Sequence, residues 1–153
     1  MERMKLGDAD FGFLAKVMRK VEFFAPMTIG QLEMILPYIL LFRYGAGEKI
    51  CRQGDEGDAF YIIRDGKVGV FVKKGFFSFS KKVAELTEGM FFGETALVTR
   101  EPRNATVLCE APTRVFALTS ADFEFVVKKN PTFAAEIEKI AKRRKFLSKH
   151  ETD

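Results

Sequence analysis

The sequence predicts one α+β domain in which a β-roll lies between an N-terminal and a C-terminal helical segment. Apolar residues recur at helical spacing near the N-terminus, and short apolar runs separated by glycines fill the middle of the chain. Helix-start signals return near residue 120. The length of 153 residues suits a single domain that buries a core of useful size.

The first segment, residues 1–40, is expected to be helical. Thr28, followed three residues later by Gln31, has the form of a capping box and predicts a short helix over residues 31–36. Pro37 should end or kink that helix, because proline lacks the backbone donor. An earlier helix is indicated by apolar residues at helical spacing, namely Phe11, Leu14, Ala15, Met18 and Val21.

The second segment, residues 41–119, should form the β-roll. Asp65-Gly66 is a two-residue turn signal between the apolar run 60–63 and the alternating valines of 68–72, and it predicts a hairpin. A second hairpin is expected from residues 106–111 and 114–118, turned at Pro112-Thr113. Strands this short, separated by turns, favour a small barrel or a double-sheet jelly roll.

The third segment, residues 120–153, should return to helix. Ser120 is a suitable N-cap with Asp122 in the first turn, and Asn130 before Pro131 starts another helix. The apolar stripe of this last helix could pack on the roll or pair two copies of the chain, so the oligomeric state stays open. The stripe consists of Phe133, Ile137, Ile140 and Ala141.

The charge is concentrated near the C-terminus. The chain has 25 basic and 21 acidic residues, and six of the basic ones lie in a stretch without acids. Without those six the balance is 19 against 21, which is typical of a solvated basic helix face and not of a nucleic-acid-binding domain. The six are Lys139, Lys142, Arg143, Arg144, Lys145 and Lys149.

Composition also excludes several chemistries. Cys51 and Cys109 are too few for a disulfide framework and are expected to be small core residues. His150 is the only histidine, so a metal site or a cupin-type enzyme is not expected, and no catalytic residues stand out. No signal peptide is visible, and the apolar run 34–42 is too short to span a bilayer. We therefore expect a cytoplasmic protein without membrane insertion.

Residues 92–107 carry the chemistry. Gly93 permits a tight backbone, Glu94 follows at once, and residues 95–98 can form a helical turn with free amides. Pro102 then fixes the approach to Arg103. One carboxylate, one guanidinium and several amides suit a ligand with one anionic phosphate and one hydroxyl group.

This stretch resembles the phosphate-binding cassette of cyclic nucleotide-binding domains. Phe92-Gly93-Glu94, Ala96 and Arg103 match the cassette at the family's spacing. A second signature upstream is matched as well, and the resemblance extends from about residue 41 to the end of the chain. The upstream matches are Ile50-Cys51, Gly54-Asp55, Gly57, the run 60–63 and Gly66.

The resemblance implies an eight-stranded antiparallel β-roll followed by helices that the family calls B and C. It implies that Glu94 binds the ribose 2′-hydroxyl and Arg103 the cyclic phosphate, with backbone amides near Ala96 and Asn104 completing the phosphate site. It further implies a C-helix residue as a lid over the base. The remaining residues expected at the ligand are Phe92, Gly93, Thr95, Ala105, the wall residues Val83 and Ala84, and the lid residue Arg144.

The expected function is a non-enzymatic sensor that binds cAMP, with cGMP as the alternative because the Asn104 carboxamide can accept from the guanine amino group. No cofactor other than this ligand is expected. Ligand-driven movement of the last helix would pass the signal to a separate effector protein. Too few residues follow Lys145 for a helix-turn-helix, so a transcription factor is not expected. The alternative is a degenerate domain acting as a scaffold, with Phe76, Phe77 and Phe79 as a partner-binding patch.

Overall fold

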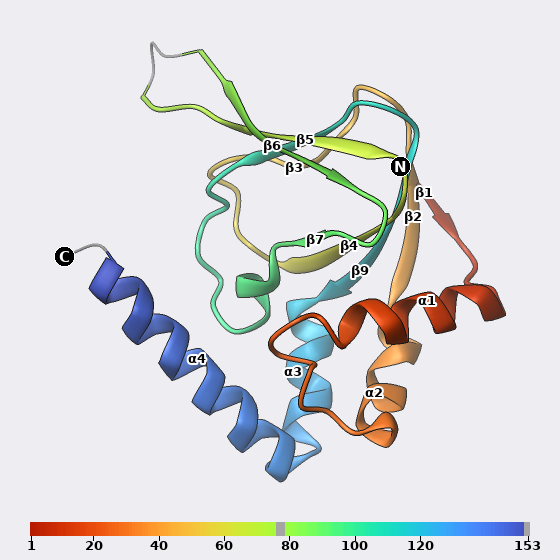
Figure 1. Cartoon of the computed structure of the whole chain (residues 1–153), viewed down its shortest axis with the longest axis vertical. Coiled ribbons are helices and arrows are strands. Elements are labelled where there is room, and N and C mark those ends of the chain that lie inside the picture. The colour runs from red at the N-terminus through yellow and green to blue at the C-terminus, as the bar shows by residue number, and fades with distance from the viewer. Residues whose placement is uncertain (76–78, 152–153) are drawn as a thin grey trace.

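The computed structural model describes residues 1–75 and 79–151, and the side chains as far as residue 143. Helices at both ends of the chain gather below a two-sheet β-roll (Figure 1). The elements are β1 (Glu2–Met4), α1 (Asp8–Met18), α2 (Ile29–Ile35), the 3-10 helix η1 (Leu36–Tyr38), β2 (Leu40–Tyr44), β3 (Lys49–Cys51), β4 (Ala59–Asp65), β5 (Lys67–Val72), β6 (Lys81–Thr87), β7 (Phe91–Phe92), the 3-10 helix η2 (Glu94–Leu97), β8 (Thr106–Cys109), β9 (Thr113–Thr119), α3 (Ser120–Lys128) and α4 (Pro131–Glu151).

The roll is a double-sheet jelly roll and not a closed barrel. One antiparallel sheet has the strand order β1-β2-β9-β4-β7, and the other has the order β3-β8-β5-β6. The described residues contain nine strands where eight were expected. One of the nine, β1, lies in the segment that was expected to be helical, and it pairs with β2 at the edge of the first sheet.

Both predicted hairpins are wrong. β4 pairs with β9 and β5 pairs with β8, so each supposed hairpin turn is a corner where the chain passes between sheets. The two corners lie against each other: the Thr113 side-chain oxygen accepts from the Lys67 amide at 3.2 Å, and Arg114 is ion-paired with Asp65. A Cβ on Gly66, whose φ is +103°, would lie 2.6 Å from the Pro112 carbonyl oxygen. The β4–β5 and β8–β9 segments therefore form one long ribbon that bends at Gly66.

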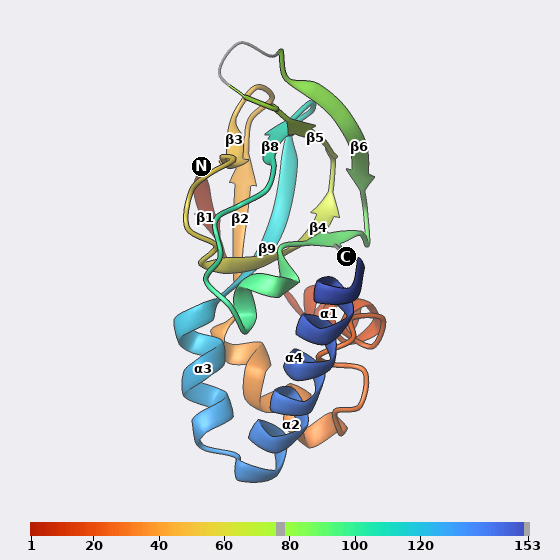
Figure 2. The same ribbon diagram turned by 90° about the vertical axis from the view of Figure 1, so that its left-hand side faces the viewer.

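β5 and β6 form a hairpin of the second sheet. β5 and β6 pair antiparallel from Lys67↔Thr87 to Val72↔Lys81, with an irregular register between Val70 and Phe71. β6 is the edge of its sheet, and the end of this hairpin projects beyond the body of the molecule (Figures 1 and 2).

Both helices predicted near the N-terminus are present, although the start of the second one differs. α2 starts two residues earlier than expected, and both halves of its capping box form: the Gln31 amide donates to Thr28 and the Thr28 amide donates to Gln31. Pro37 follows the end of α2 and lies in η1. In α1, Leu14, Val17 and Met18 face the core, while Phe11 stays partly exposed.

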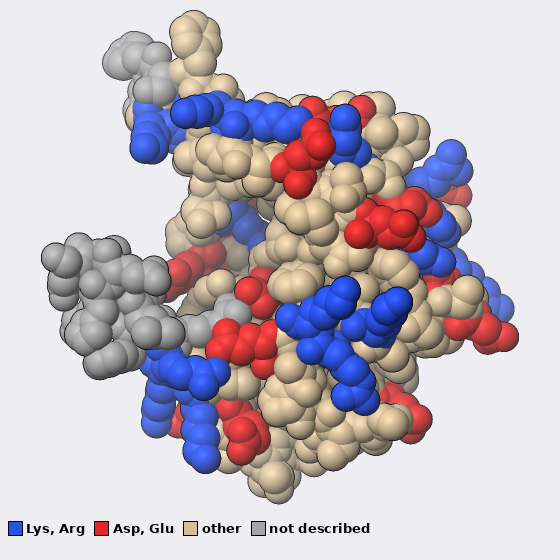
Figure 3. Space-filling model, viewed as in Figure 1, with Lys and Arg blue, Asp and Glu red and all other residues tan. Residues whose placement is uncertain are grey.

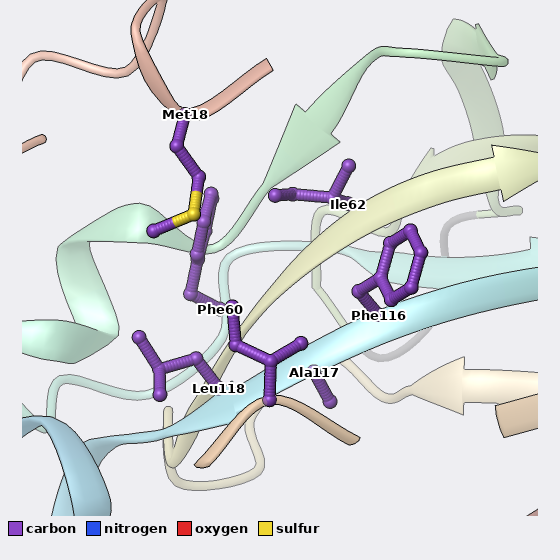
Figure 4. A pocket seen from close by; sticks show the side chains of 7 residues that line it. Met18, Phe60, Ile62, Phe116, Ala117 and Leu118 are labelled. Atoms are coloured by element: carbon purple, nitrogen blue, oxygen red, sulfur yellow. The ribbon is translucent and has the colours of Figure 1, made fainter. Parts of the chain in front are cut away.

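The main core joins the helices to the first sheet. Phe24 contacts both Phe60 and Phe123, with ring centroids 5.9 and 5.8 Å apart. Met18 and Phe60 lie over β9 beside a cavity of about 10 Å³, as Figure 4 shows. A void of that size is at the lower limit for holding one water molecule, so the junction is closely packed.

The C-terminal helices differ from expectation at one cap. Thr119 is the N-cap of α3 and accepts from the Asp122 amide, whereas the buried Ser120 hydroxyl donates to the Ala96 carbonyl oxygen at 2.5 Å. Phe133, Ile137 and Ile140 of α4 are buried in the main core. The apolar stripe of α4 is therefore covered by the chain itself.

The two cysteines are unpaired and pack with the second core, between the sheets. Burial raises the pKa of both thiols, so neither is poised as a nucleophile.

Candidate ligand-binding site

A pocket of about 330 Å³ opens beside β7, η2 and the segment that leads into β8. The space-filling view shows the molecule hollowed below the β5–β6 hairpin (Figure 3). Seven of the expected ligand residues line this pocket: Phe92, Gly93, Glu94, Thr95, Ala96, Arg103 and Asn104.

Gly93 leaves room for the Arg103 guanidinium in the wall of the pocket. Its φ is +79°, a conformation that residues with a Cβ rarely adopt, and it caps the start of η2. A Cβ at this position would lie 2.5 Å from Arg103 Nη1 and 3.0 Å from the Ala59 carbonyl oxygen. A side chain on residue 93 would therefore displace the guanidinium.

Arg103 is nearly buried, and neighbouring groups hold its guanidinium in place. Its side chain is only 8% exposed, and Nη2 lies 3.6 Å from Asp58 Oδ1. Nη2 donates to the Ala59 carbonyl oxygen at 2.6 Å, and the guanidinium lies over the Tyr61 ring, 5.7 Å from its centroid. The buried Nε makes no hydrogen bond to any residue that the structure describes. A buried guanidinium with an unused donor has the charge and the hydrogen-bonding capacity that an anionic ligand would require.

The upstream signature holds the segment that carries Arg103. The Arg103 amide donates to the Asp55 carbonyl oxygen at 2.6 Å, and the Gly54 amide donates to the Arg103 carbonyl oxygen at 2.8 Å. At Gly57 a Cβ would lie 2.8 Å from the Glu101 carbonyl oxygen. The two sequence signatures, well apart along the chain, thus meet in space as one structural unit.

One of the backbone amides that were expected to bind the ligand is already hydrogen-bonded within the turn η2. The Ala96 amide donates to the Gly93 carbonyl oxygen at 3.1 Å, and so it is occupied within the turn. The Thr99 amide and hydroxyl both bond to the Thr95 carbonyl oxygen. Through Ser120, the Ala96 carbonyl oxygen connects η2 to the first residue of α3.

The other expected ligand residues lie outside this pocket lining. Val83 is 56% exposed on β6, and its neighbour Ala84 pairs with Val70. Ala105 lies just before β8 and is half-buried. Arg144 belongs to α4, but its side chain is outside the described residues.

Sequence reasoning missed several contributors. Five residues that were not assigned to the site line it: Gly57, Phe91, Thr99, Glu101 and Pro102. Asp58 and the Ala59 carbonyl oxygen hold the guanidinium. Gly57 was visible in the upstream signature, whereas a backbone carbonyl such as that of Ala59 has no signal in a sequence.

Burial determines the charge state of Tyr61, the residue whose ring lies beside the Arg103 guanidinium. Burial raises the pKa of Tyr61 to about 12, although the positive charge of Arg103 opposes the shift. The phenol is therefore neutral at physiological pH, and the ring beside the guanidinium adds no charge.

Comparison with known proteins identifies the class. The family model described as "Cyclic nucleotide-binding domain" matches residues 41–130. The chain belongs to this family of ligand-binding regulatory domains.

Individual relatives carry the same domain in longer proteins. The chain is 37% identical over 103 residues to a cAMP-dependent protein kinase regulatory subunit of Dictyostelium discoideum, covering 64% of this chain and 31% of the relative. It is 33% identical over 109 residues to a cGMP-dependent protein kinase of Eimeria tenella, covering 71% and 10%. The chain thus spans a tenth to a third of the length of these relatives.

A solved structure agrees on the fold. The N-terminal domain of a transcriptional regulator from Streptomyces coelicolor A3(2) superimposes with a TM-score of 0.76 at 21% identity, covering 90% of this chain and 95% of that one. Across the described part of the chain, no helix has the length and apolar character needed to cross a membrane. The same residues contain no cluster suited to a metal ion.

Proposed function

We propose that the chain is a non-enzymatic sensor of a cyclic nucleotide, which binds with its phosphate at Arg103 and its ribose 2′-hydroxyl at Glu94. The observation that carries the proposal is the Arg103 guanidinium, nearly buried at the pocket wall with Nε unpartnered among the described residues. Gly93 provides the space that this position requires.

Charge balance supports a cyclic phosphodiester over a phosphomonoester. A cyclic phosphate carries one negative charge, which matches one guanidinium and forms charge-assisted hydrogen bonds with it. A monoester carries up to two negative charges at neutral pH and would be repelled by the Glu94 carboxylate in the same lining.

The contacts behind the pocket support a route for the signal. Ser120 joins η2 to α3, and a groove of about 340 Å³ lies between η2, α3 and α4. Nucleotide bound at η2 would change the position of α3 and draw α4 towards the base, and the moved helix would act on a separate effector protein. Arg144 and the wall residues Val83 and Ala84 would then approach the base.

The preferred nucleotide is proposed to be cAMP, with Asn104 deciding how well cGMP is tolerated. Asn104 is exposed at the pocket rim, where its carboxamide could accept from a guanine amino group. The relatives described above are named for both nucleotides. Exchanging Asn104 for alanine should raise the ratio of the cGMP Kd to the cAMP Kd, and exchange for threonine should preserve that ratio.

The test is a calorimetric titration of refolded, nucleotide-free protein with cAMP and cGMP. We expect a Kd in the micromolar range or below, and Arg103→Ala should weaken binding by about 1.5–3 kcal/mol through loss of charged hydrogen bonds. Arg100→Ala is the matched control, because Arg100 lies in the same loop with a half-exposed side chain and only loose ion pairs at 3.9 Å.

Equal loss of affinity in both arginine variants would contradict the assignment of the phosphate to Arg103. Absence of binding by the folded, unaltered chain would instead favour the scaffold alternative.

A further inference from the structure

An ion pair outside the nucleotide pocket joins the two helical ends of the chain. Arg143 Nη2 donates to Glu22 Oε1 at 2.5 Å, across 121 positions of the sequence. Glu22 lies in the connection between α1 and α2, and Arg143 lies in α4. The patch expected at the tip of the β5–β6 hairpin does not enter the inference, because Phe76 and Phe77 lie outside the described residues.

Glu22 stands on a firmly packed part of the N-terminal segment. The residues on either side of it, Val21 and Phe23, are both 0% exposed and belong to the main core. The Ala25 amide donates to the Val21 carbonyl oxygen at 2.8 Å and closes a turn that contains Glu22. Because a closely packed core holds its backbone in place, the position of this carboxylate is fixed relative to the core.

Arg143 continues the buried stripe of α4. Phe133, Ile137 and Ile140 are buried in the main core, and Arg143 follows Ile140 by three residues, which places it on the same face of the helix. Its side chain is 61% exposed, against 37% for Glu22. The ion pair therefore forms where the apolar contact of α4 ends and the helix leaves the core.

This ion pair differs from the other charged contact of α4. Lys142 is ion-paired with Glu138 at 3.2 Å, one turn away on the same helix. Within the part of the chain that the structure describes, Arg143 is the one residue of α4 that forms an ion pair with another element. The Glu22–Arg143 pair is thus the electrostatic contact that depends on where α4 lies.

The ion pair and the nucleotide pocket lie on different elements. The pocket is formed by β7, η2 and the segment before β8. The helices α1 and α2, whose connection contains Glu22, lie below the roll (Figures 1 and 2). Movement of α4 towards a bound base would separate Arg143 from Glu22, because Glu22 belongs to the packed N-terminal segment and not to α4.

We propose that the Glu22–Arg143 ion pair is a clasp that holds α4 against the N-terminal segment and thereby lowers the apparent affinity for the cyclic nucleotide. The inference rests on the proposed function, because it requires α4 to move when the nucleotide binds. The apparent Kd then equals the intrinsic Kd divided by the fraction of molecules in which α4 has moved. Removal of the clasp raises this fraction and strengthens binding.

Calorimetric titration with cAMP of Glu22→Gln, Arg143→Gln and the double variant tests the clasp. Partly exposed ion pairs contribute modestly, so each single exchange should lower the Kd about twofold to fourfold. The double variant should lower it no further, because both exchanges remove the same interaction. The two exchanges change the net charge in opposite directions, so a shared gain cannot arise from long-range attraction of the anionic nucleotide.

Glu136→Gln is the matched control. Glu136 is exposed on α4 and forms no ion pair with any residue that the structure describes. Its exchange removes the same charge as Glu22→Gln without touching the clasp. It should therefore leave the Kd for cAMP unchanged.

Hydrogen exchange of the α4 amides measures how firmly the helix is held in protein without nucleotide. In Glu22→Gln and in Arg143→Gln, the amides after Ile140 should exchange about twofold to fourfold faster, because local opening of the helix no longer breaks the ion pair. Glu136→Gln should exchange like the unaltered chain. Thermal unfolding should show that all of these variants remain folded.

The two measurements separate the clasp from the proposed function. Tighter cAMP binding together with faster exchange in both clasp variants would support the proposal. Unchanged or weaker binding in these variants, in a chain that does bind cAMP, would overturn the clasp and leave the proposed function standing. Absence of binding by the folded, unaltered chain would overturn the proposed function itself. Unchanged exchange in the clasp variants would overturn the clasp without reference to any nucleotide.

Discussion

Gly93 and Arg103 share a space that holds either a Cβ atom or the guanidinium, since a Cβ on residue 93 would lie 2.5 Å from Nη1. Glycine is therefore required at this position by its neighbour as well as by its own positive φ. This relationship links the first half of the cassette to the second and fixes the position of the guanidinium.

Gly93→Ala should weaken cAMP binding about tenfold or more, because the displaced guanidinium loses a charge-assisted hydrogen bond. Gly89→Ala separates this effect from backbone strain. Gly89 has a similar φ of +81° but open space around its Cβ position. Gly89→Ala should lose about 1–2 kcal/mol of unfolding free energy through backbone strain alone. Gly93→Ala should lose more, because its Cβ also meets Arg103 and the Ala59 carbonyl oxygen, and only Gly93→Ala should lose affinity in calorimetry. Equal affinities in the two variants would contradict the proposed relationship.

Gly66→Ala should destabilise the fold by about 2–5 kcal/mol through strain and overpacking. A Cβ there would meet Thr113 Oγ1 at 2.5 Å and the Pro112 carbonyl oxygen at 2.6 Å. Gly54→Ala, at a φ of +91° with no atom within 4 Å, should lose only about 1–2 kcal/mol in urea unfolding. If both variants unfolded alike, the two chain corners could not be packed against each other.

Thr28→Ala should lower the unfolding free energy by about 1 kcal/mol, because it removes the side-chain acceptor of the α2 capping box. Thr132→Ala, in the exposed first turn of α4, should change it by less than about 0.5 kcal/mol. Denaturant titration of the two variants side by side measures the difference. A larger loss in Thr132→Ala would argue against the assigned cap.

Acid should weaken the contact between α1 and β4. Burial raises the pKa of the Asp10 carboxyl, but the Gly7 amide and the Arg64 guanidinium outweigh burial, so the pKa lies below its usual value. A lowered pKa contributes stability above the unfolded value of about 3.9, and that stability is lost as pH falls through the folded value. The stability advantage of the unaltered chain over Asp10→Asn should therefore narrow as pH falls below about 4. An advantage that is independent of pH in urea unfolding would contradict this account.

The sequence predicted the helices well because their signals are local. The Thr28–Gln31 cap needs only residues that are close along the chain, and it forms as expected. Strand pairing failed for the opposite reason: Asp65-Gly66 fits a hairpin turn and a corner between sheets equally well. The choice is made by Thr113 and Arg114, which are distant in sequence and pack against the corner.

The side chains of the candidate site were predicted in part, because the sequence motif that contains them is local. The motif located Glu94 and Arg103, and the structure brings both to one pocket. The Ala59 carbonyl oxygen that fixes the guanidinium belongs to the backbone of β4. Every residue has such a carbonyl group, so the sequence does not indicate which one contacts Arg103. Val83 and Ala84, also expected at the ligand, lie on the exposed edge strand β6, and the sequence did not predict this edge position because it is a property of the whole sheet.

The account is tested most directly by one calorimetric comparison of cAMP, cGMP and 5′-AMP on the unaltered, nucleotide-free chain. We predict saturable binding of a cyclic nucleotide with a Kd in the micromolar range or below. Binding of 5′-AMP should be at least about tenfold weaker, because its second charge faces Glu94. No heat with either cyclic nucleotide, or equal affinity for 5′-AMP, would contradict a site built for one cyclic phosphate.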